Sequence, residues 1–193
     1  MSLRVVILGS SAAVPSIKRN LPSVAIKYFG NVYLFDCGEG TQRQMMIHSV
    51  SYAKVKAVFI THLHADHYLG LAGLIHTLKF TDRKEKLQVF GPRGINEKIQ
   101  NLFKVLPVFV EINEIGPNAT YAENTFTIKS IAVNHTENSL GYVFEENKKR
   151  NFDKEKANRL GIFGKTFGLL EKNGKVKINN KTIKFQDVSN VKK

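Results

Sequence analysis

The sequence predicts an α/β fold, in which short apolar strands alternate with amphipathic helices. Apolar runs that end in small or polar residues are typical of strands, and they occupy residues 3–8, parts of 22–36, 56–60, 87–90, 108–112, 125–133 and 139–144. Apolar residues at roughly helical spacing indicate helices at 40–48, 67–80 and 94–104. With 193 residues, of which 42% are hydrophobic, the chain is long enough for one domain with a buried core.

The boundaries of these elements follow from local residue types. The first strand ends in the small-residue turn 9–13, which we interpret as a close backbone approach in preference to a phosphate-binding loop. The helix at 40–48 begins near Thr41, a residue that can cap it or lie close to a phosphate. The helix at 67–80 is indicated by its spaced leucines and isoleucine, Leu69, Leu71, Leu74, Ile75 and Leu78.

Residues 60–67 read Ile-Thr-His-Leu-His-Ala-Asp-His and carry His62, His64, Asp66 and His67 at the turn from strand to helix. In an extended turn, residues two apart point the same way, so His62 and His64 can converge on one ion while Asp66 and His67 face a second. Imidazole and carboxylate ligands favour zinc, with iron or manganese as alternatives. A metal pair lowers the pKa of a bridging water and clamps a phosphoryl or acyl oxygen. Asp66 could orient or deprotonate that water, ligate the second metal, or do both.

Two further residues have a defined place relative to the strands. His135 follows the strand 125–133 and is a candidate ligand at a strand end, with an ordinary polar loop residue as the alternative. Cys37, the single cysteine, follows an apolar strand and is expected to be a buried structural thiol. The start of the chain runs directly into a strand, and no apolar stretch reaches membrane-spanning length, so we expect a cytoplasmic protein without membrane contact.

The last quarter of the chain is strongly basic. Residues 145–193 hold 14 lysine and arginine residues against 6 acidic ones, a net charge of +8 out of the +13 of the whole chain. We therefore divide the chain into a core at 1–144 and a basic region at 145–193. Basic side chains neutralise phosphates and give salt-dependent affinity for nucleic acids. The candidate RNA contacts are Lys165, Lys172, Lys175 and Lys177, and the alternative is a solvated tail that keeps the protein soluble.

The motif His-Leu-His-Ala-Asp-His resembles the HxHxDH signature of the metallo-β-lactamase superfamily, whose fold is a four-layer αββα sandwich with metals at one edge of its two sheets. Other segments are similar to one branch of it, the ribonuclease Z family of transfer-RNA 3′-processing endonucleases. These segments are Val-Val-Ile-Leu-Gly at 5–9 with Pro15, Arg-Asn-Leu-Pro-Ser at 19–23, Leu-Phe-Asp-Cys-Gly-Glu-Gly-Thr-Gln-Arg-Gln at 34–44, Gly-Pro-Arg-Gly at 91–94 and Val-Asn-His-Thr at 133–136.

This resemblance implies a specific site and activity. His62, His64 and His135 would bind one metal, and Asp66 and His67 the other, with Asp66 also the proton acceptor. The implied activity is a zinc-dependent endoribonuclease, with two zinc ions per complete site, that removes the 3′ trailer from precursor transfer RNA. The implied function of residues 145–193 is an arm that protrudes from the core and grips the RNA, with a helix near 152–160 and a glycine-rich tip at 161–168.

Members of that family are longer and supply further aspartate and histidine ligands after this point. The chain has no histidine past His135, and its only later aspartates are Asp153 and Asp187, in a helix-like segment and in the tail. We therefore expect only the first half of the sandwich, from a fragment, a natural truncation or a chain completed by another polypeptide. An exposed apolar face would then favour a homodimer.

Two other functions remain open from the sequence. One is a non-catalytic RNA-binding or assembly subunit, which the missing late ligands favour. The other is a different metallo-β-lactamase-fold hydrolase that acts on a small phosphodiester, sulfate ester or lactone, against which the basic region argues.

Overall fold

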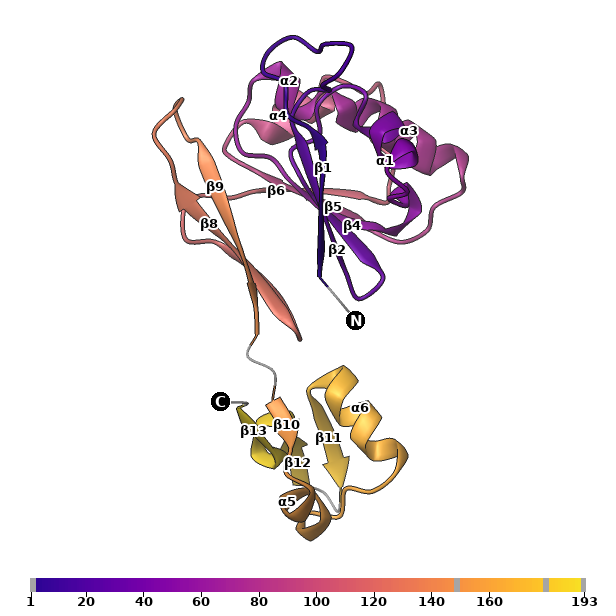
Figure 1. Cartoon of the computed structure of the whole chain (residues 1–193), viewed down its shortest axis with the longest axis vertical. Coiled ribbons are helices and arrows are strands. Elements are labelled where there is room, and N and C mark those ends of the chain that lie inside the picture. The colour runs from indigo at the N-terminus through magenta and orange to yellow at the C-terminus, as the bar shows by residue number, and fades with distance from the viewer. Residues whose placement is uncertain (1–2, 148–149, 179–180, 192–193) are drawn as a thin grey trace. The chain divides into compact units, whose positions relative to one another are not determined.

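A computed structural model of the chain describes residues 3–147, 150–178 and 181–191 (Figure 1). The chain forms two compact units. The first comprises Met1–Ala119 and Ser130–Tyr142, and the second comprises Thr120–Lys129 and Val143–Lys193. Among the helices described, none combines the length and the apolar character needed to cross a lipid bilayer.

The first unit is built on a six-stranded sheet with helices packed against it. The strands, in the order in which they lie in the sheet, are β1 (Arg4–Gly9), β2 (Ser23–Tyr28), β3 (Asn31–Phe35), β4 (Val55–Phe59), β5 (Leu87–Gly91) and β6 (Val110–Glu114). The helices are α1 (Thr41–Ile47), the short 3-10 helix η1 (Tyr52–Lys54), α2 (Ala65–Tyr68), α3 (Gly70–Phe80) and α4 (Ile95–Gln100). Figure 1 shows α1, α3 and α4 gathered on one side of this sheet.

The core of the first unit lies between the sheet and these helices. Side chains alternate between the two faces of a strand, so Val6 and Leu8 of β1 point into this core, whereas Val5 and Ile7 point to the opposite face. Helix α3 contributes fully buried side chains at helical spacing, namely Leu71, Leu74, Ile75 and Leu78. Packing of this stripe against the strands is the main source of stability for a short helix.

The opposite face of the sheet carries aromatic side chains. Phe59 stacks between Phe35 and Phe90, with ring centroids 5.3 and 5.1 Å away, and Tyr142 contacts the edge of Phe59 at 5.4 Å. Val5 and Ile7 lie on the same face at the edge strand and are 54% and 55% exposed. An exposed apolar face, as expected from the sequence, is therefore present at β1.

The functional edge of the sheet is set by strand direction. Strands β3, β4 and β5 are mutually parallel, so their carboxyl ends meet at one edge. The residues that follow these strands are Asp36, the segment from Ile60 onward, and Pro92. This edge is the usual place for binding sites in open α/β sheets.

Strand β7 (Thr120–Glu123), β8 (Phe126–Ala132) and β9 (Leu140–Glu146) form a three-stranded sheet, and β8 and β9 each run through both units. The rest of the second unit comprises β10 (Arg150–Phe152), α5 (Lys154–Arg159), α6 (Lys165–Asn173), β11 (Lys175–Ile178), β12 (Lys181–Lys184), the 3-10 helix η2 (Phe185–Val188) and β13 (Ser189–Val191). A separate small core fills this unit and contains Ala157, Ile162, Leu170, Ile183 and Val188.

Several element boundaries differ from the sequence prediction. The predicted helix 67–80 is divided at Leu69, because the Gly70 N–H bonds the Cys37 carbonyl at 2.9 Å and does not continue α2. The predicted helix 94–104 ends at Gln100, although the apolar Leu102 and Phe103 still pack on the core and extend the pattern. Strands β7, β10, β11, β12 and β13 were not predicted, and neither was α6, which begins within the glycine-rich segment 161–168.

We expect Gly70→Ala to lower the free energy of unfolding by about 1–3 kcal/mol, the usual cost of overpacking. A Cβ on Gly70 would lie 2.0 Å from the Gly38 carbonyl oxygen, a backbone atom that cannot move aside. The matched control is Gly73→Ala in the same helix, where the Cβ meets only the end of the Gln42 side chain at 3.1 Å. Urea denaturation of both variants measures the difference, and equal midpoints would contradict the steric argument.

Candidate metal centre

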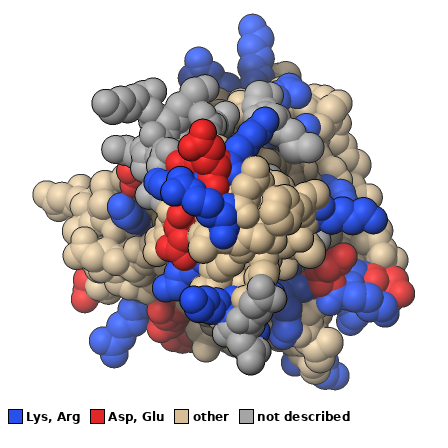
Figure 2. All heavy atoms as spheres, turned by 90° about the horizontal axis from the view of Figure 1, so that it is seen from below, with Lys and Arg blue, Asp and Glu red and all other residues tan. Residues whose placement is uncertain are grey.

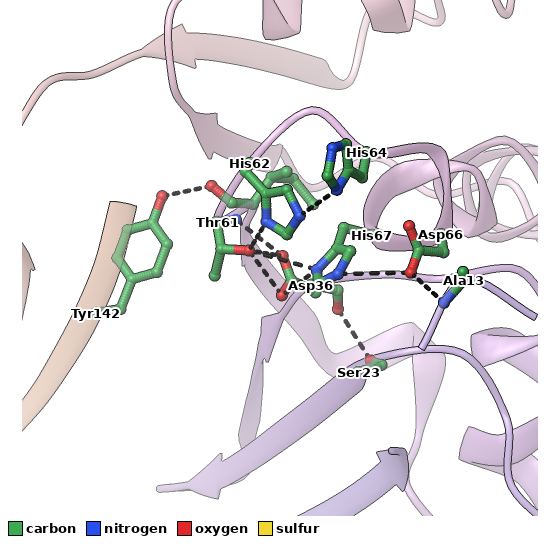
Figure 3. Close-up of polar contacts among 10 residues, drawn as sticks. Ala13, Ser23, Asp36, Thr61, His62, His64, Asp66, His67 and Tyr142 are labelled. Carbon is green, nitrogen blue, oxygen red and sulfur yellow. Dashed lines mark hydrogen bonds and ion pairs between the residues drawn. The ribbon is translucent and has the colours of Figure 1, made fainter. Parts of the chain in front are cut away.

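Residues 60–67, which carry four of the predicted ligands, follow β4 and are held by the chain on both sides of that strand (Figure 3). The Ile60 N–H donates to the Phe90 carbonyl at 2.8 Å, which continues the β4–β5 pairing up to the site. At its other end, the His67 carbonyl accepts the Cys37 N–H at 2.7 Å. The loop is therefore anchored at both ends by backbone hydrogen bonds.

The structure brings three of the predicted ligands together. His62, His64 and His135 each offer a ring nitrogen, and these atoms all lie within 4.8 Å of one another. The His62 side chain is buried and the other two are exposed. His135 comes from the turn between β8 and β9, more than 60 residues along the chain, so its candidacy rests on the fold as well as on the sequence. Three converging imidazoles are the protein ligand set of several catalytic zinc sites.

Hydrogen bonds determine which ring nitrogens face one another. The Nδ1 atom of His62 lies 2.9 Å from the Thr61 hydroxyl, and that hydroxyl also lies 3.0 Å from both carboxylate oxygens of Asp36. Since the hydroxyl hydrogen is used toward the carboxylate, His62 Nδ1–H donates to the Thr61 oxygen. Its Nε2 then presents a lone pair to His64 Nδ1, 3.1 Å away. These two nitrogens form a hydrogen bond when His64 Nδ1 carries a proton, and they can share a cation when it does not.

Asp36 holds the second histidine in the same way. Its Oδ2 lies 2.8 Å from His67 Nδ1, and its Oδ1 accepts the Thr61 N–H at 2.8 Å. His67 Nδ1–H therefore donates to Asp36 and leaves Nε2 free on the side of Asp66. Carboxylates that orient ligating histidines in this way are a regular part of metal sites.

Asp66 lies beside His67, with 3.7 Å between its Oδ2 and His67 Nε2. The same oxygen accepts the N–H of Ala13 at 2.9 Å, so the turn after β1 positions this carboxylate (Figure 3). Asp66 and His67 thus lie side by side next to the three-histidine cluster. Their role as a second pair of metal ligands stays a prediction.

The environment shifts three pKa values in this site. Burial, together with the neighbouring His67 ring, lowers the pKa of His62 to about 4, so this ring is neutral at neutral pH. For His67, burial alone would lower the pKa, but the hydrogen bond and charge of Asp36 outweigh it and raise the pKa. Burial would raise the pKa of Asp66, and the Ala13 N–H and His67 outweigh it and lower the pKa. When His67 is protonated, a cation at its Nε2 has to displace that proton, so cation binding weakens as the pH falls.

Residues of the site that sequence reasoning did not assign are Asp36, Thr61 and Tyr142. Asp36 adopts a left-handed backbone conformation with φ 58°, which is uncommon outside glycine and concentrates at functional sites. The Tyr142 hydroxyl donates to the Ile60 carbonyl at 2.8 Å and so supports the start of the loop from β9. The signal available in the sequence was the position of Asp36 directly after an apolar strand.

Cys37 is fully buried, and this burial raises the pKa of its thiol to about 12. The expected structural role is confirmed by its burial. Asp153 and Asp187 serve as helix caps: the Asp153 carboxylate accepts the Lys156 N–H at 3.1 Å, and the Asp187 carboxylate accepts the Lys184 N–H at 2.8 Å. Neither carboxylate belongs to the metal-ligand cluster identified among the described residues.

The predicted RNA-contacting lysines belong to the second unit. Lys165 begins α6, and Lys175 and Lys177 alternate on β11, all three with exposed side chains. Lys172 falls in α6, and its side chain lies outside the described part of the structure. Figure 2 shows basic side chains spread around the visible face with acidic ones between them. The rings of Phe152 and Phe167 contact each other, with 4.8 Å between their centroids, and both pack on the core of this unit. They therefore stabilise the second unit.

Comparison with known proteins identifies the family. A family model described as anti-Pycsar protein Apyc1 matches residues 3–157. Ribonuclease Z of Methanothermobacter thermautotrophicus is 39% identical over 191 residues, and that of Thermococcus sibiricus is 42% identical over 193 residues. These alignments cover 96% and 97% of this chain but 62% and 63% of the relatives, so the chain spans less than two thirds of their length.

Solved structures agree with this assignment. The human tRNase Z, short form, superimposes with a TM-score of 0.67 at 29% identity, over 75% of this chain and 64% of the human one. The metallo-β-lactamase fold protein YhfI of Bacillus subtilis superimposes with a TM-score of 0.62 at 18% identity, over 76% of this chain and 59% of YhfI, and supports the fold alone. The chain is thus a metallo-β-lactamase-fold protein with a histidine cluster at the sheet edge. It belongs to the family of the model that matches residues 3–157, and over almost its whole length it is similar to ribonucleases Z.

We expect Asp36→Asn to weaken metal binding by about 10–100-fold, the usual effect of losing a carboxylate that orients a ligating histidine. The amide keeps the shape of the side chain but cannot accept both the Thr61 and the His67 hydrogen bonds as an anion does. Competition with a chromophoric zinc chelator measures the affinity. The control is Asp82→Asn, which removes an exposed carboxylate paired with Lys84, and a similar loss in this control would contradict the assignment.

Proposed function

We propose that this chain carries the metal-binding part of a zinc-dependent endoribonuclease that removes the 3′ trailer from precursor transfer RNA. The observation that carries the proposal is the convergence of His62, His64 and His135, with Asp66 and His67 beside them, in a chain about 40% identical to ribonucleases Z. The chain spans less than two thirds of those relatives, so the activity is proposed for the whole protein of which this sequence represents the matching part.

The donor set of the site fits zinc ions. Imidazole nitrogens and a carboxylate are ligands that zinc accepts readily, and iron or manganese would accept a similar set. His62 Nε2, His64 Nδ1 and one nitrogen of His135 would hold one ion, and Asp66 and His67 Nε2 would hold the other. When bound, a zinc pair lowers the pKa of water and neutralises charge on a phosphoryl group.

The protein's own residues prepare this site for phosphodiester cleavage. Asp36 and Thr61 keep the Nδ1 protons of His67 and His62 away from the centre, so that both Nε2 atoms point inward. Asp66 is ionised, because its pKa is lowered, and one of its oxygens can accept a proton from an attacking water. We propose Asp66 as the proton acceptor for in-line attack on phosphorus, which leaves a 3′-hydroxyl on the transfer RNA.

The second unit would supply sequence-independent affinity for RNA. Lys165, Lys175 and Lys177 are exposed, and none of them forms an ion pair with another described residue. We propose that they and Lys172 contact phosphates of the precursor. Phe163 is 60% exposed and could stack on an unpaired base, whereas Phe152 and Phe167 are engaged in the core.

We propose a cytoplasmic location, which is consistent with the proposed precursor transfer RNA substrate. We also propose a homodimer through the apolar face at β1, where Val5 and Ile7 are more than half exposed. Light scattering after size exclusion measures this, and a monomer that persists at high protein concentration would contradict it.

Assays of cleavage, RNA binding and metal content distinguish the proposed function from two others. A hydrolase of small phosphodiesters or esters would turn over a chromogenic diester without competition from precursor transfer RNA. A non-catalytic RNA-binding or assembly subunit would bind RNA and show no zinc-dependent cleavage. The metal content helps to distinguish them, since fewer than two tightly held ions per chain would indicate an incomplete site.

We expect Asp66→Ala to reduce cleavage of a labelled precursor transfer RNA by more than about 100-fold, since general-base groups contribute roughly that much or more. RNA affinity should change by less than about threefold, because phosphate contacts elsewhere dominate binding. Product mapping should place the wild-type cut after the discriminator nucleotide. Cleavage by the variant at the wild-type rate, with zinc present, would rule out this role.

We expect the variant with Lys165, Lys175 and Lys177 all changed to Gln to bind RNA more weakly and with a flatter dependence on salt. Each lost phosphate contact reduces the slope of log affinity against log salt by about one unit. Filter binding at several salt concentrations measures it, and Lys84, which pairs with Asp82 in the first unit, provides the control substitution. An unchanged salt slope would mean that these lysines do not contact the RNA.

A further inference from the structure

A cavity of about 380 Å³ lies in the first unit, and none of the candidate metal ligands lines it. Its wall combines the turn after β5, the end of β6 and the turn between β8 and β9. The main lining residues are Arg93, Glu114, Gly116, Val133, Asn138 and Leu140. The cavity therefore mixes apolar surface with one cationic side chain, one amide and the carboxylate of Glu114, which is engaged by backbone N–H groups.

One wall of the cavity belongs to the same turn as a proposed metal ligand. His135 lies between Val133 and Asn138, both of which line the cavity. The turn is held rigid by Ser139, whose carbonyl accepts the Val133 N–H at 3.2 Å and whose hydroxyl accepts the Thr136 N–H at 3.0 Å. A ligand in the cavity would thus lie next to the residues that hold His135.

The other wall touches the loop of the metal centre. A Cβ on Gly94 would lie 3.0 Å from Leu63 Cδ1, so the turn that carries Arg93 packs directly against the residue between His62 and His64. Glu114 fixes this turn, because its carboxylate accepts the N–H of Gly94 at 2.9 Å and that of Asn96 at 3.1 Å. Both walls are therefore held in place relative to the predicted ligands.

The size and chemistry of the cavity select the kind of ligand. Ligand sites range from about 300 to 1,000 Å³, so this one suits a single nucleoside-sized group and is too small for a base pair. The exposed Arg93 guanidinium suits a phosphate, and the apolar wall suits the face of a base. Asn138 offers both a donor and an acceptor, and unpaired RNA bases are recognised through such contacts at their edges.

We propose that this cavity holds one unpaired nucleotide that flanks the scissile phosphate, with Arg93 on its phosphate and Asn138 at the edge of its base. The proposal rests on the proposed function, because it requires RNA at the metal centre. The cavity would then discriminate between substrates by the nucleotide beside the scissile phosphate, which the metal ligands do not contact. An RNA that pairs this nucleotide, or lacks its base, would be a poorer substrate.

Two variants test the cavity without touching the proposed ligands. Gly116→Val adds bulk to its wall, and it should be tolerated because a Cβ at Gly116 meets no atom within 4 Å and its φ is not left-handed. Arg93→Ala removes the proposed phosphate contact. Lys98→Ala, an exposed basic residue on the neighbouring helix α4, controls for the loss of one positive charge.

The measurement compares intact precursor transfer RNA with RNAs that carry an abasic site on either side of the cleavage position. We expect the zinc-loaded wild type and Lys98→Ala to prefer the intact RNA by about tenfold in kcat/KM and in affinity, a typical value for one base contact. Gly116→Val and Arg93→Ala should lose most of this preference. Hydrolysis of bis(p-nitrophenyl) phosphate, which does not reach the cavity, should stay within about twofold in all four proteins.

The outcomes separate this inference from the proposed function. Equal preference for the intact RNA in all four proteins, with cleavage intact, would overturn the cavity assignment and leave the endoribonuclease in place. Absence of cleavage by the wild type would count against the proposed function, and the affinities for intact and abasic RNA would then decide about the cavity. Equal affinities would overturn it, and a preference lost in Gly116→Val would support it.

Discussion

The Asp36 carboxylate is the interaction on which the rest of the site depends. A buried carboxylate is costly unless it is hydrogen-bonded, and Asp36 is satisfied by the Thr61 N–H, the Thr61 hydroxyl and His67 Nδ1. Those partners come from the end of β4 and from α2, whereas Asp36 follows β3. One side chain thus fixes the spacing of two strand ends and a helix, and at the same time sets the orientation of two candidate ligands.

Close backbone packing completes this arrangement. A Cβ on Gly38 would lie 2.4 Å from the Asp66 carbonyl oxygen, and one on Gly70 would lie 2.0 Å from the Gly38 carbonyl oxygen. Only glycine permits these approaches. The segment around Asp36-Cys37-Gly38 therefore acts as a platform on which α2 and the start of α3 rest. Its physical role explains why these residue types occur together just before α1.

Four of the five candidate ligands lie within one turn, where spacing alone defines their geometry, so the sequence was sufficient to propose them. Their role as ligands stays a prediction. Asp36 and Thr61 could not be assigned in the same way, since their contact depends on the parallel register of β3 and β4, for example Phe35 opposite Phe59. Strand order is not encoded in local periodicity. The six strands and most helices of the first unit were predictable because their apolar spacing is regular.

The second unit was harder to predict because its lysines obscured its apolar pattern. Strand β11 reads Lys-Val-Lys-Ile, and the alternation of exposed lysines with half-buried Val176 and Ile178 is the period of a strand. We interpreted this region by its charge and so missed that Ile183 and Leu170 give it a core.

The two units also divide the candidate functions between them. All five predicted metal ligands lie in the first unit, and the four candidate RNA-contacting lysines lie in the second, which has its own apolar core. Each core is stabilised by its own side chains, so exposed lysines can change without altering the packing that orients the histidines. Under the proposed function, affinity for RNA and chemistry at phosphorus would therefore rest on separate cores. The cavity proposed to hold a nucleotide is the exception, because its wall and the candidate ligand His135 share one turn. Selection of the nucleotide would there be coupled to reaction at the phosphate.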